Sequence, residues 1–321
     1  MFASTARFTA KNLFPLIVLA GIALGQACNV VRWHRASVAK HFQELGLASK
    51  VVQLGSGTMH LFEGGRGIPL LLIHGFPMGA LETWENQADA FVARFHLLTP
   101  DLFWFGASLP TDKAGMIPAA EQADATVELL RVANIEKAHV VGFSFGGYVA
   151  LQLALRHPEV VDRLVLVDAA GLEPTEEERA IVQANFDGVD DICQMLIPKD
   201  AETLRRFLSK LFYRPRWLPL LVMRQLLEDE FWKNKEAKER ICRRLTSGGM
   251  LGPDDLGTLR VPALVLWGRH DPLLLPSMGE RMARAIPGAR LVFLEESGHQ
   301  PMLEEPDRFN QVVLDFLGEK P

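Results

Sequence analysis

Short apolar runs alternate with longer stretches of helix-forming residues from about Val51 to the C-terminus. Several of these runs are apolar throughout, which is typical of strands that are buried on both faces of a parallel sheet. The segments between them are long enough for the crossovers that parallel strands require. The pattern therefore predicts a mostly parallel sheet flanked by helices, with strands at Thr58–Glu63, Pro69–Ile73, His96–Pro100, His139–Phe143, Arg163–Val167, Ala263–Trp267 and Arg290–Leu294.

One interval in this alternation is much longer than a crossover needs. It lies between the strands that end at Val167 and begin at Ala263, and it contains three stretches rich in helix formers. We interpret this interval as a helical lid inserted into the sheet domain, from about Gly171 to Asp255. The sheet domain then consists of residues 51–170 and 256–321. The predicted lid helices are Glu173–Asn185, Ala201–Phe212 and Glu228–Arg244.

The first 31 residues form a separate segment in the hydrophobicity pattern. Arg7 and Lys11 precede the apolar run Leu13–Ala27, and no charged residue occurs between positions 12 and 31. A removable signal peptide, a lipoprotein signal at Cys28 and an uncleaved anchor all fit this arrangement. We therefore expect a protein that is membrane-associated or exported. Basic residues follow the run as densely as they precede it, so the positive-inside rule assigns no orientation.

Composition narrows the classes of partner. The chain of 321 residues is 48% hydrophobic, which is enough to bury a sizeable core. Its formal net charge of -5 and its pI near 6.0 provide no basic field of the kind that attracts nucleic acid. A nucleic-acid partner is therefore not expected.

The three cysteines, Cys28, Cys193 and Cys242, show neither metal-ligand spacing nor the density of a disulfide-rich scaffold. Cys193 and Cys242 can pair if the chain is exported. We favour the alternative, two free thiols packed as small apolar groups. No metal site is expected.

The strongest chemical signal is a G-x-S-x-G sequence, Gly142-Phe143-Ser144-Phe145-Gly146, between an apolar strand and a helix-forming run. A serine in such a sharp strand-to-helix turn projects its hydroxyl above the sheet, and the glycines allow the backbone to pass. An inert serine in a glycine-rich turn is the alternative for the pentapeptide alone. Because both flanking elements are present, we predict that Ser144 is a nucleophile.

A serine hydroxyl needs a base that removes its proton, and the base needs a carboxylate that orients it. His299 follows the last predicted strand, in a loop at the carboxyl edge of the sheet where a side chain can reach Ser144. Asp271 and Asp168 both follow strands at that edge and compete for the third role. We favour Asp271, because Asp168 can also be a polar strand end or a helix cap.

A negatively charged tetrahedral intermediate needs two hydrogen-bond donors already in place. The backbone N–H of Phe145 is one candidate. The other is the N–H of Phe76, in the glycine turn His74-Gly75-Phe76-Pro77 after a predicted strand. Pro77 has no N–H to donate. We interpret His74 as a structural residue that braces this turn.

Four blocks in this order resemble the signatures of the α/β-hydrolase superfamily, over roughly Val51 to the C-terminus. They are Leu72–Pro77, Gly142–Gly147, Gly268–Pro272 and Ser297–His299. The basic-flanked N-terminal segment and the helical lid resemble those of membrane-associated monoacylglycerol lipases and related bacterial lipases. The chain departs from this pattern at Phe103 and Trp104, where relatives commonly carry proline and glycine. These aromatic residues either line an acyl pocket or pack under the lid.

The resemblance implies hydrolysis of carboxylic esters, lipid-like ones in particular, through an acyl-enzyme on Ser144 and without metal or organic cofactor. The apolar lid run Leu211–Met223 supports a lipid-like ester if it contacts acyl chains or bilayer, although packing on the main domain explains it equally well. Carbon–carbon bond hydrolysis and cofactor-free perhydrolysis use the same triad and stay open, as does a non-catalytic binding module. Dehalogenases and epoxide hydrolases of this fold carry aspartate at the Ser144 position, which argues against them.

Overall fold

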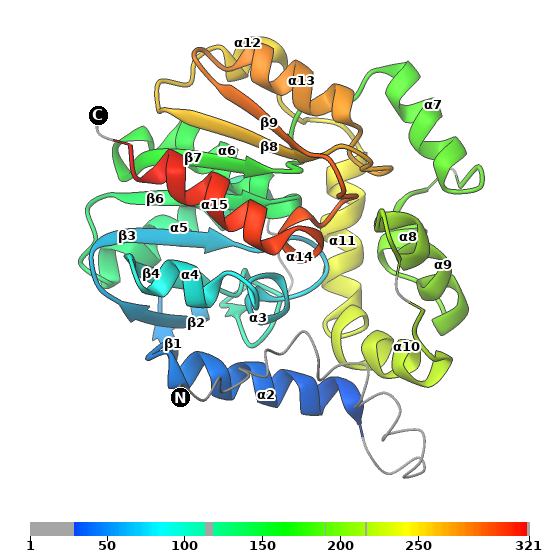
Figure 1. Cartoon of the computed structure of the whole chain (residues 1–321), viewed down its shortest axis with the longest axis horizontal. Helices are drawn as coiled ribbons and strands as arrows, with labels where there is room; N and C mark the ends of the chain where they lie inside the picture. Colours follow the sequence, from blue (N-terminus) through cyan, green and yellow to red (C-terminus); the bar gives the residue numbers. More distant parts are fainter. Residues whose placement is uncertain (1–28, 113–117, 190, 216, 320–321) are drawn as a thin grey trace, which may run out of the picture.

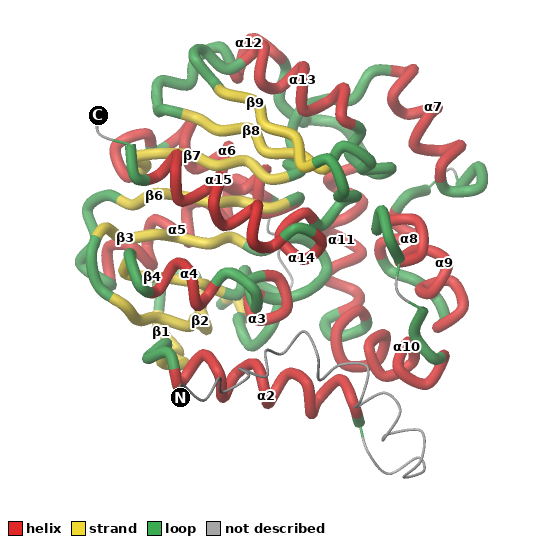
Figure 2. The backbone as a smooth tube through the Cα atoms, in the orientation of Figure 1, coloured by secondary structure: helices red, strands yellow, loops and turns green. Residues whose placement is uncertain are grey.

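The computed structural model describes residues 29–112, 118–189, 191–215 and 217–319. Within these residues the chain forms one nine-stranded sheet in the order β1-β2-β4-β3-β6-β7-β8-β9, with β5 paired to β2 (Figures 1 and 2). The ladders that join β4, β3, β6, β7, β8 and β9, in this spatial order, are parallel. Strand β2 pairs antiparallel with β1, β4 and β5. The strands are β1 (Ala48–Gln53), β2 (Gly57–Gly65), β3 (Ile68–Ile73), β4 (Phe95–Pro100), β5 (Leu109–Pro110), β6 (Ala138–Phe143), β7 (Val161–Val167), β8 (Ala263–Gly268) and β9 (Arg290–Leu294).

All seven predicted strands are present, and their bounds differ from the predicted ones by at most two residues. The mostly parallel sheet predicted from the sequence is therefore confirmed. Strands β1 and β5 were not predicted. Most residues of β1 are exposed, so this edge strand has no buried face to leave an apolar pattern.

Both faces of the sheet are buried under helices. In β8, Leu264 and Leu266 pack into one core while Val265 and Trp267 pack into the other, because successive side chains of a strand point to opposite faces. This is why the central strands read as continuous apolar runs. The helices of the main domain are α2 (Val30–Glu44), α3 (Ala80–Thr83), α4 (Ala88–Val92), α5 (Ala119–Val132), α6 (Phe145–Arg156), η2 (Pro158–Val160), α13 (Pro276–Ala285), α14 (Pro301–Glu304) and α15 (Pro306–Leu317).

The interval between β7 and β8 is helical, and all its helices except the last lie at the end of the sheet to which the parallel strands point (Figure 1). A bridge between Leu172 and Leu251 joins its two ends, with the Leu251 N–H donating to the Gly171 carbonyl at 2.7 Å. We call residues 171–255 the helical insertion. Its elements are α7 (Glu176–Asn185), α8 (Cys193–Leu196), α9 (Ala201–Leu211), α10 (Leu220–Leu226), the π-helical turn η3 (Leu227–Phe231), α11 (Lys235–Thr246) and α12 (Pro253–Leu256), the last of which extends one residue past it.

Two helices of the insertion start with side-chain caps. In α7 the Thr175 hydroxyl accepts from the Glu178 N–H while the Glu178 carboxylate accepts from the Thr175 N–H, and in α9 the Asp200 carboxylate accepts from the Thr203 N–H. The single helix predicted for Glu228–Arg244 is wrong. The chain breaks at Asn234, which takes a left-handed conformation before α11 and donates its amide to the Trp104 carbonyl at 3.0 Å.

Helix α2 connects the N-terminal side of the chain to the helical insertion. Asn29 donates to Asp229 at 2.6 Å, the Val30 N–H donates to Gln225 at 2.9 Å, and Arg32 forms an ion pair with Asp229 at 2.7 Å. Arg35 bridges Glu230 of the insertion and Glu82 of the main domain. These contacts place the end of the predicted N-terminal segment beside α10 and η3.

Cys193 and Cys242 form a disulfide with a Cα–Cα distance of 5.8 Å, so the expectation of two free thiols is wrong. The sequence allowed this pair without favouring it, because only the folded insertion brings α8 against α11 across a separation of 49 residues. The bond ties these two helices together, and Phe76 packs against the small apolar cluster that the two cysteines form with Ile197.

No helix in the described ranges is long and apolar enough to cross a bilayer. The predicted apolar segment Leu13–Ala27, and Cys28 with it, lies outside the described residues.

Candidate active site

Ser144 lies in the turn between β6 and α6, with φ 52° and ψ −117°. This region of backbone space is sterically costly for a residue with a side chain, so the surrounding structure must hold it. The Ser144 N–H donates to the Val167 carbonyl at 2.9 Å, and the Ser144 carbonyl accepts from the Ala170 N–H at 2.9 Å. The neighbouring strand β7 and its following loop therefore fix the turn.

Two glycines allow the chain to pass this turn closely. A Cβ atom at Gly146 would lie 2.3 Å from the His74 carbonyl oxygen, and one at Gly75 would lie 3.1 Å from the Ser144 Cβ. Only glycine permits the first of these approaches. The loop after β3 therefore lies directly against the serine.

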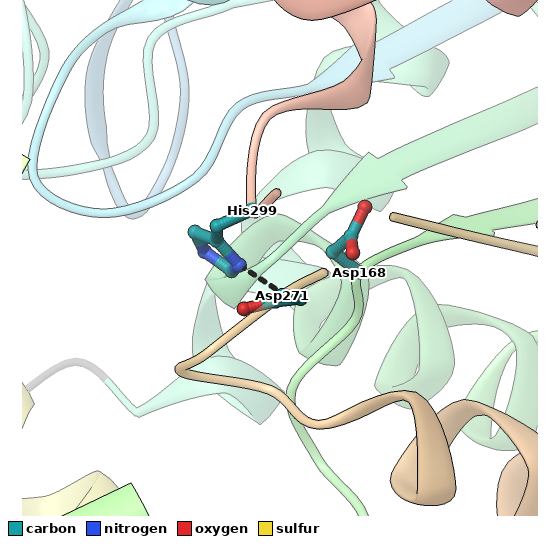
Figure 3. A group of neighbouring side chains, drawn as sticks. All are labelled: Asp168, Asp271 and His299. Atoms are coloured by element: carbon teal, nitrogen blue, oxygen red, sulfur yellow. Dashed lines mark hydrogen bonds and ion pairs between the residues drawn. The ribbon is translucent and has the colours of Figure 1, made fainter. Parts of the chain in front are cut away.

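The three residues predicted as a triad are brought together in one hydrogen-bonded chain. The His299 Nε2 lies 3.1 Å from the Ser144 Oγ, and the His299 Nδ1 lies 2.6 Å from the Asp271 Oδ2 (Figure 3 shows the second contact). Ser144 is 8% exposed, His299 4% and Asp271 2%. With the Nδ1 proton donated to the carboxylate, Nε2 is free to accept the proton of the serine hydroxyl.

The loop that carries His299 is held by groups that sequence reasoning missed. The backbone N–H of His299 donates to the carbonyl of Leu211, the last residue of α9 in the insertion, at 2.8 Å. The Gly298 N–H donates to Glu304 at 2.8 Å, and the Ser297 hydroxyl donates to Glu305 at 2.7 Å. Burial raises the pKa of Glu304. Nothing in the sequence marks a main-chain acceptor such as Leu211 as part of the site.

Of the two competing aspartates, Asp271 is the one bonded to His299. Its other oxygen accepts the N–H groups of Leu273 and Leu274 at 2.8 and 3.0 Å. Asp168 is fully buried beside it and accepts the Gly268 N–H at 2.9 Å (Figure 3). Burial, together with the nearby Asp271 carboxylate, raises the pKa of Asp168 well above its ordinary value.

The residues proposed as backbone donors flank the serine. Phe145 is the first residue of α6, where a helix leaves its N–H groups without internal partners. Phe76 precedes a cis bond to Pro77, and its ring meets the Phe145 ring edge-on with centroids 6.5 Å apart. Both residues therefore belong to the lining around Ser144.

His74 occupies a structural position, as the sequence suggested. It is fully buried, its Nδ1 lies 2.8 Å from the Gly75 carbonyl, and its Nε2 accepts the Leu102 N–H at 2.9 Å. Burial lowers the pKa of His74, so the neutral ring fits these two bonds. Phe103 and Trp104 are buried in the main core, and the Trp104 carbonyl accepts the amide of Asn234 from the insertion, so this loop packs under the insertion.

Comparison with known proteins agrees with this geometry. Residues 68–306 match the model of the alpha/beta hydrolase fold, so the chain belongs to that family. Lipase 1 of Psychrobacter immobilis is 27% identical over 290 residues, covering 89% of this chain and 87% of its own. The 2-hydroxy-6-oxononadienedioate/2-hydroxy-6-oxononatrienedioate hydrolase of Paraburkholderia phymatum is 29% identical, covering 86% of this chain and 97% of its own.

Among solved structures, a membrane phospholipase A described as a bacterial virulence factor superposes with a TM-score of 0.77 at 28% identity. The match covers 97% of this chain and 98% of that one. The chain is thus an α/β-hydrolase with both lipase-like and carbon–carbon hydrolase relatives.

The close approach at Gly146 gives a stability prediction. In Gly146→Ala the new methyl group meets the carbonyl oxygens of Ile73 and His74, which are backbone atoms that cannot rotate away. We expect the free energy of unfolding to fall by about 1–3 kcal/mol, as overpacking typically costs. Urea denaturation measures this. Gly252→Ala is the control, because its nearest neighbour would lie 3.7 Å away, and an equal effect in both variants would contradict the account.

Proposed function

We propose that this protein is a serine hydrolase that cleaves carboxylic esters through an acyl-enzyme on Ser144. The observation that carries the proposal is the buried chain from Ser144 through His299 to Asp271. This arrangement supplies a nucleophile, a base within hydrogen-bond reach of it and a carboxylate that orients the base.

In the proposed reaction the Ser144 Oγ attacks the ester carbonyl carbon while His299 Nε2 takes the hydroxyl proton. The backbone N–H groups of Phe76 and Phe145 stabilise the oxyanion that forms. The carbon–oxygen bond then breaks, and His299 returns its proton to the leaving alcohol. Water repeats the sequence on the acyl-enzyme, which releases the acid and restores Ser144. Asp271 stabilises the imidazolium in both halves.

We further propose that the ester is lipid-like, of the monoacylglycerol lipase or carboxylesterase type. A cavity of about 210 Å³ beside Phe145 is lined by apolar side chains, among them Ile241, Leu245 and Met250, and by the polar side chains of Gln152 and Arg244. The apolar part of this lining would contact an acyl chain. Lipase relatives and the membrane phospholipase A structure support the same substrate class.

The substrate class is tested with p-nitrophenyl esters of increasing acyl length, using the full chain in detergent. We expect wild-type activity to rise with acyl length, and Ser144→Ala to lose about 10⁴-fold or more in kcat. Ser209→Ala, on the exposed face of α9, is the control and should match the wild type. Activity confined to short chains would indicate a general carboxylesterase.

Carbon–carbon bond hydrolysis is the second candidate, because several relatives at 26–29% identity are named hydrolases of 2-hydroxy-6-oxo dienoates. A wild-type protein that is inert on every ester but cleaves 2-hydroxy-6-oxo-6-phenylhexa-2,4-dienoate would establish this candidate and refute the first. Loss of that cleavage in Ser144→Ala would show that the same site performs it.

We also propose that the protein works at a membrane surface. Exposed apolar side chains gather before and at the start of α10, with Trp217 73% exposed and Leu220 and Leu221 beside it in sequence. Helix α10 contacts α2, which begins at Val30, shortly after the predicted apolar run Leu13–Ala27. The disulfide fits an oxidising compartment, which agrees with export or with an anchored domain outside the cytoplasm.

The membrane proposal predicts a selective defect in Trp217→Ser/Leu220→Ser/Leu221→Ser. We expect hydrolysis of monoacylglycerol in phospholipid vesicles to fall about tenfold, because less apolar surface enters the interface. Hydrolysis of a water-soluble short ester should be unchanged. Val51→Ser/Ile68→Ser/Val132→Ser removes three exposed apolar side chains elsewhere and serves as the control. Equal vesicle activity in the two triple variants would contradict the proposal.

A further inference from the structure

Two carboxyl groups lie side by side under the catalytic histidine. Asp168 follows β7 and Asp271 follows the neighbouring strand β8, and these strands are in register with Val167 opposite Leu266. Donor or acceptor atoms of Asp168, Asp271 and His299 all lie within 4.8 Å of one another (Figure 3). The reaction proposed above uses only one of the two carboxyl groups, so the other needs an explanation.

The two groups cannot both carry a negative charge at low cost. Asp168 is 0% exposed, and Asp271 is almost as deeply buried. Among the residues described, neither aspartate forms an ion pair with a lysine or an arginine. The basic side chain that does contact the pair is His299, which bonds to Asp271. A like charge beside a buried carboxylate favours the protonated form, and burial together with the nearby Asp271 raises the pKa of Asp168.

The hydrogen bonds decide which group holds that proton. Asp271 accepts two backbone N–H groups and the His299 Nδ1–H, and three donors stabilise a carboxylate. Asp168 accepts only the Gly268 N–H, on Oδ1, and in the described part of the chain its Oδ2 has no donor facing it. The proton therefore belongs on Asp168 Oδ2.

Glu304, another charged group near the pair, also favours the protonated form of Asp168. Glu304 of α14 acts electrostatically on Asp168 and adds negative potential. Its own oxygens accept the N–H groups of Gly298 and Tyr213. With Asp271 from the β8 loop, His299 from the β9 loop and Glu304 from α14 around it, Asp168 faces more negative than positive groups.

We propose that Asp168 is a positioning residue, a neutral carboxylic acid that turns its O–H toward the Asp271 carboxylate and so holds it against His299. The same side chain anchors Gly268, the last residue of β8, directly before the loop that carries Asp271. Its backbone supports this placement, because Asp168 has φ 38° and donates its N–H to the Leu266 carbonyl at 3.0 Å. The inference rests on the proposed function for its kinetic consequence, but not for the protonation state.

The protonation state of Asp168 is tested by infrared spectroscopy on the full chain near neutral pH, with the Asp168→Asn spectrum subtracted from that of the wild type. We expect the wild type to show a protonated-carboxyl C=O band that is missing in Asp168→Asn. Asp162→Asn removes an exposed carboxylate from the same strand and should leave that band in place. An Asp168→Asn spectrum that keeps every protonated-carboxyl band would overturn the proposal, whether or not the protein hydrolyses esters.

The positioning role is tested by the pH profile of kcat/KM on a water-soluble ester. Asparagine can accept from Gly268 and donate to Asp271, so Asp168→Asn should keep at least about a third of the activity, with its acid limb in place. Asp168→Ala should lower kcat about tenfold with KM little changed.

Two outcomes would overturn the role. If the acid limb of Asp168→Asn moves down by about one pH unit, Asp168 carries a charge that favours the imidazolium, contrary to the proposal. If Asp168→Asn is as slow as Asp168→Ala while both melt like the wild type, the donated hydrogen bond does not position the triad. Should Asp168→Ala fail to fold, the asparagine profile and the infrared band still decide.

Discussion

The site depends on one buried chain of hydrogen bonds at the carboxyl edge of a parallel sheet. Ser144, Asp271 and His299 come from loops after β6, β8 and β9, and the sheet places these loops at one end. Because these three side chains are almost completely buried, each of their polar groups needs a hydrogen-bond partner within the protein. The backbone N–H groups that donate to Asp271 and the acceptors around the histidine loop meet this requirement.

The helical insertion helps to hold the site in place. The Leu211 carbonyl binds the backbone of His299, and Asn234 binds the loop of Trp104 that packs beside Phe76 and Phe145. Helix α2 in turn binds the insertion through Asp229 and Glu230. The N-terminal helix, the insertion and the histidine loop are thus linked by direct contacts.

The sequence was sufficient for features that follow from local pattern. Continuous apolar runs located the central strands, and the glycine-flanked serine located the turn. What escaped depended on contacts between distant segments. The break at Asn234 and the edge strand β1 were not predicted, and the Cys193–Cys242 pair was considered but not favoured. From sequence position alone, Asp168 and Asp271 were alternative candidates for the carboxylate that orients His299. Only the register of β7 and β8 shows that the two side chains lie side by side.

The central claim is that Ser144 is an activated nucleophile, and covalent labelling tests it most directly. The full chain is treated with diethyl p-nitrophenyl phosphate, and the modified residue is located by peptide mass spectrometry. We expect one diethylphosphoryl adduct, on Ser144, whose formation slows strongly in His299→Ala because the base is removed. An adduct on another residue, or equal labelling without His299, would contradict it.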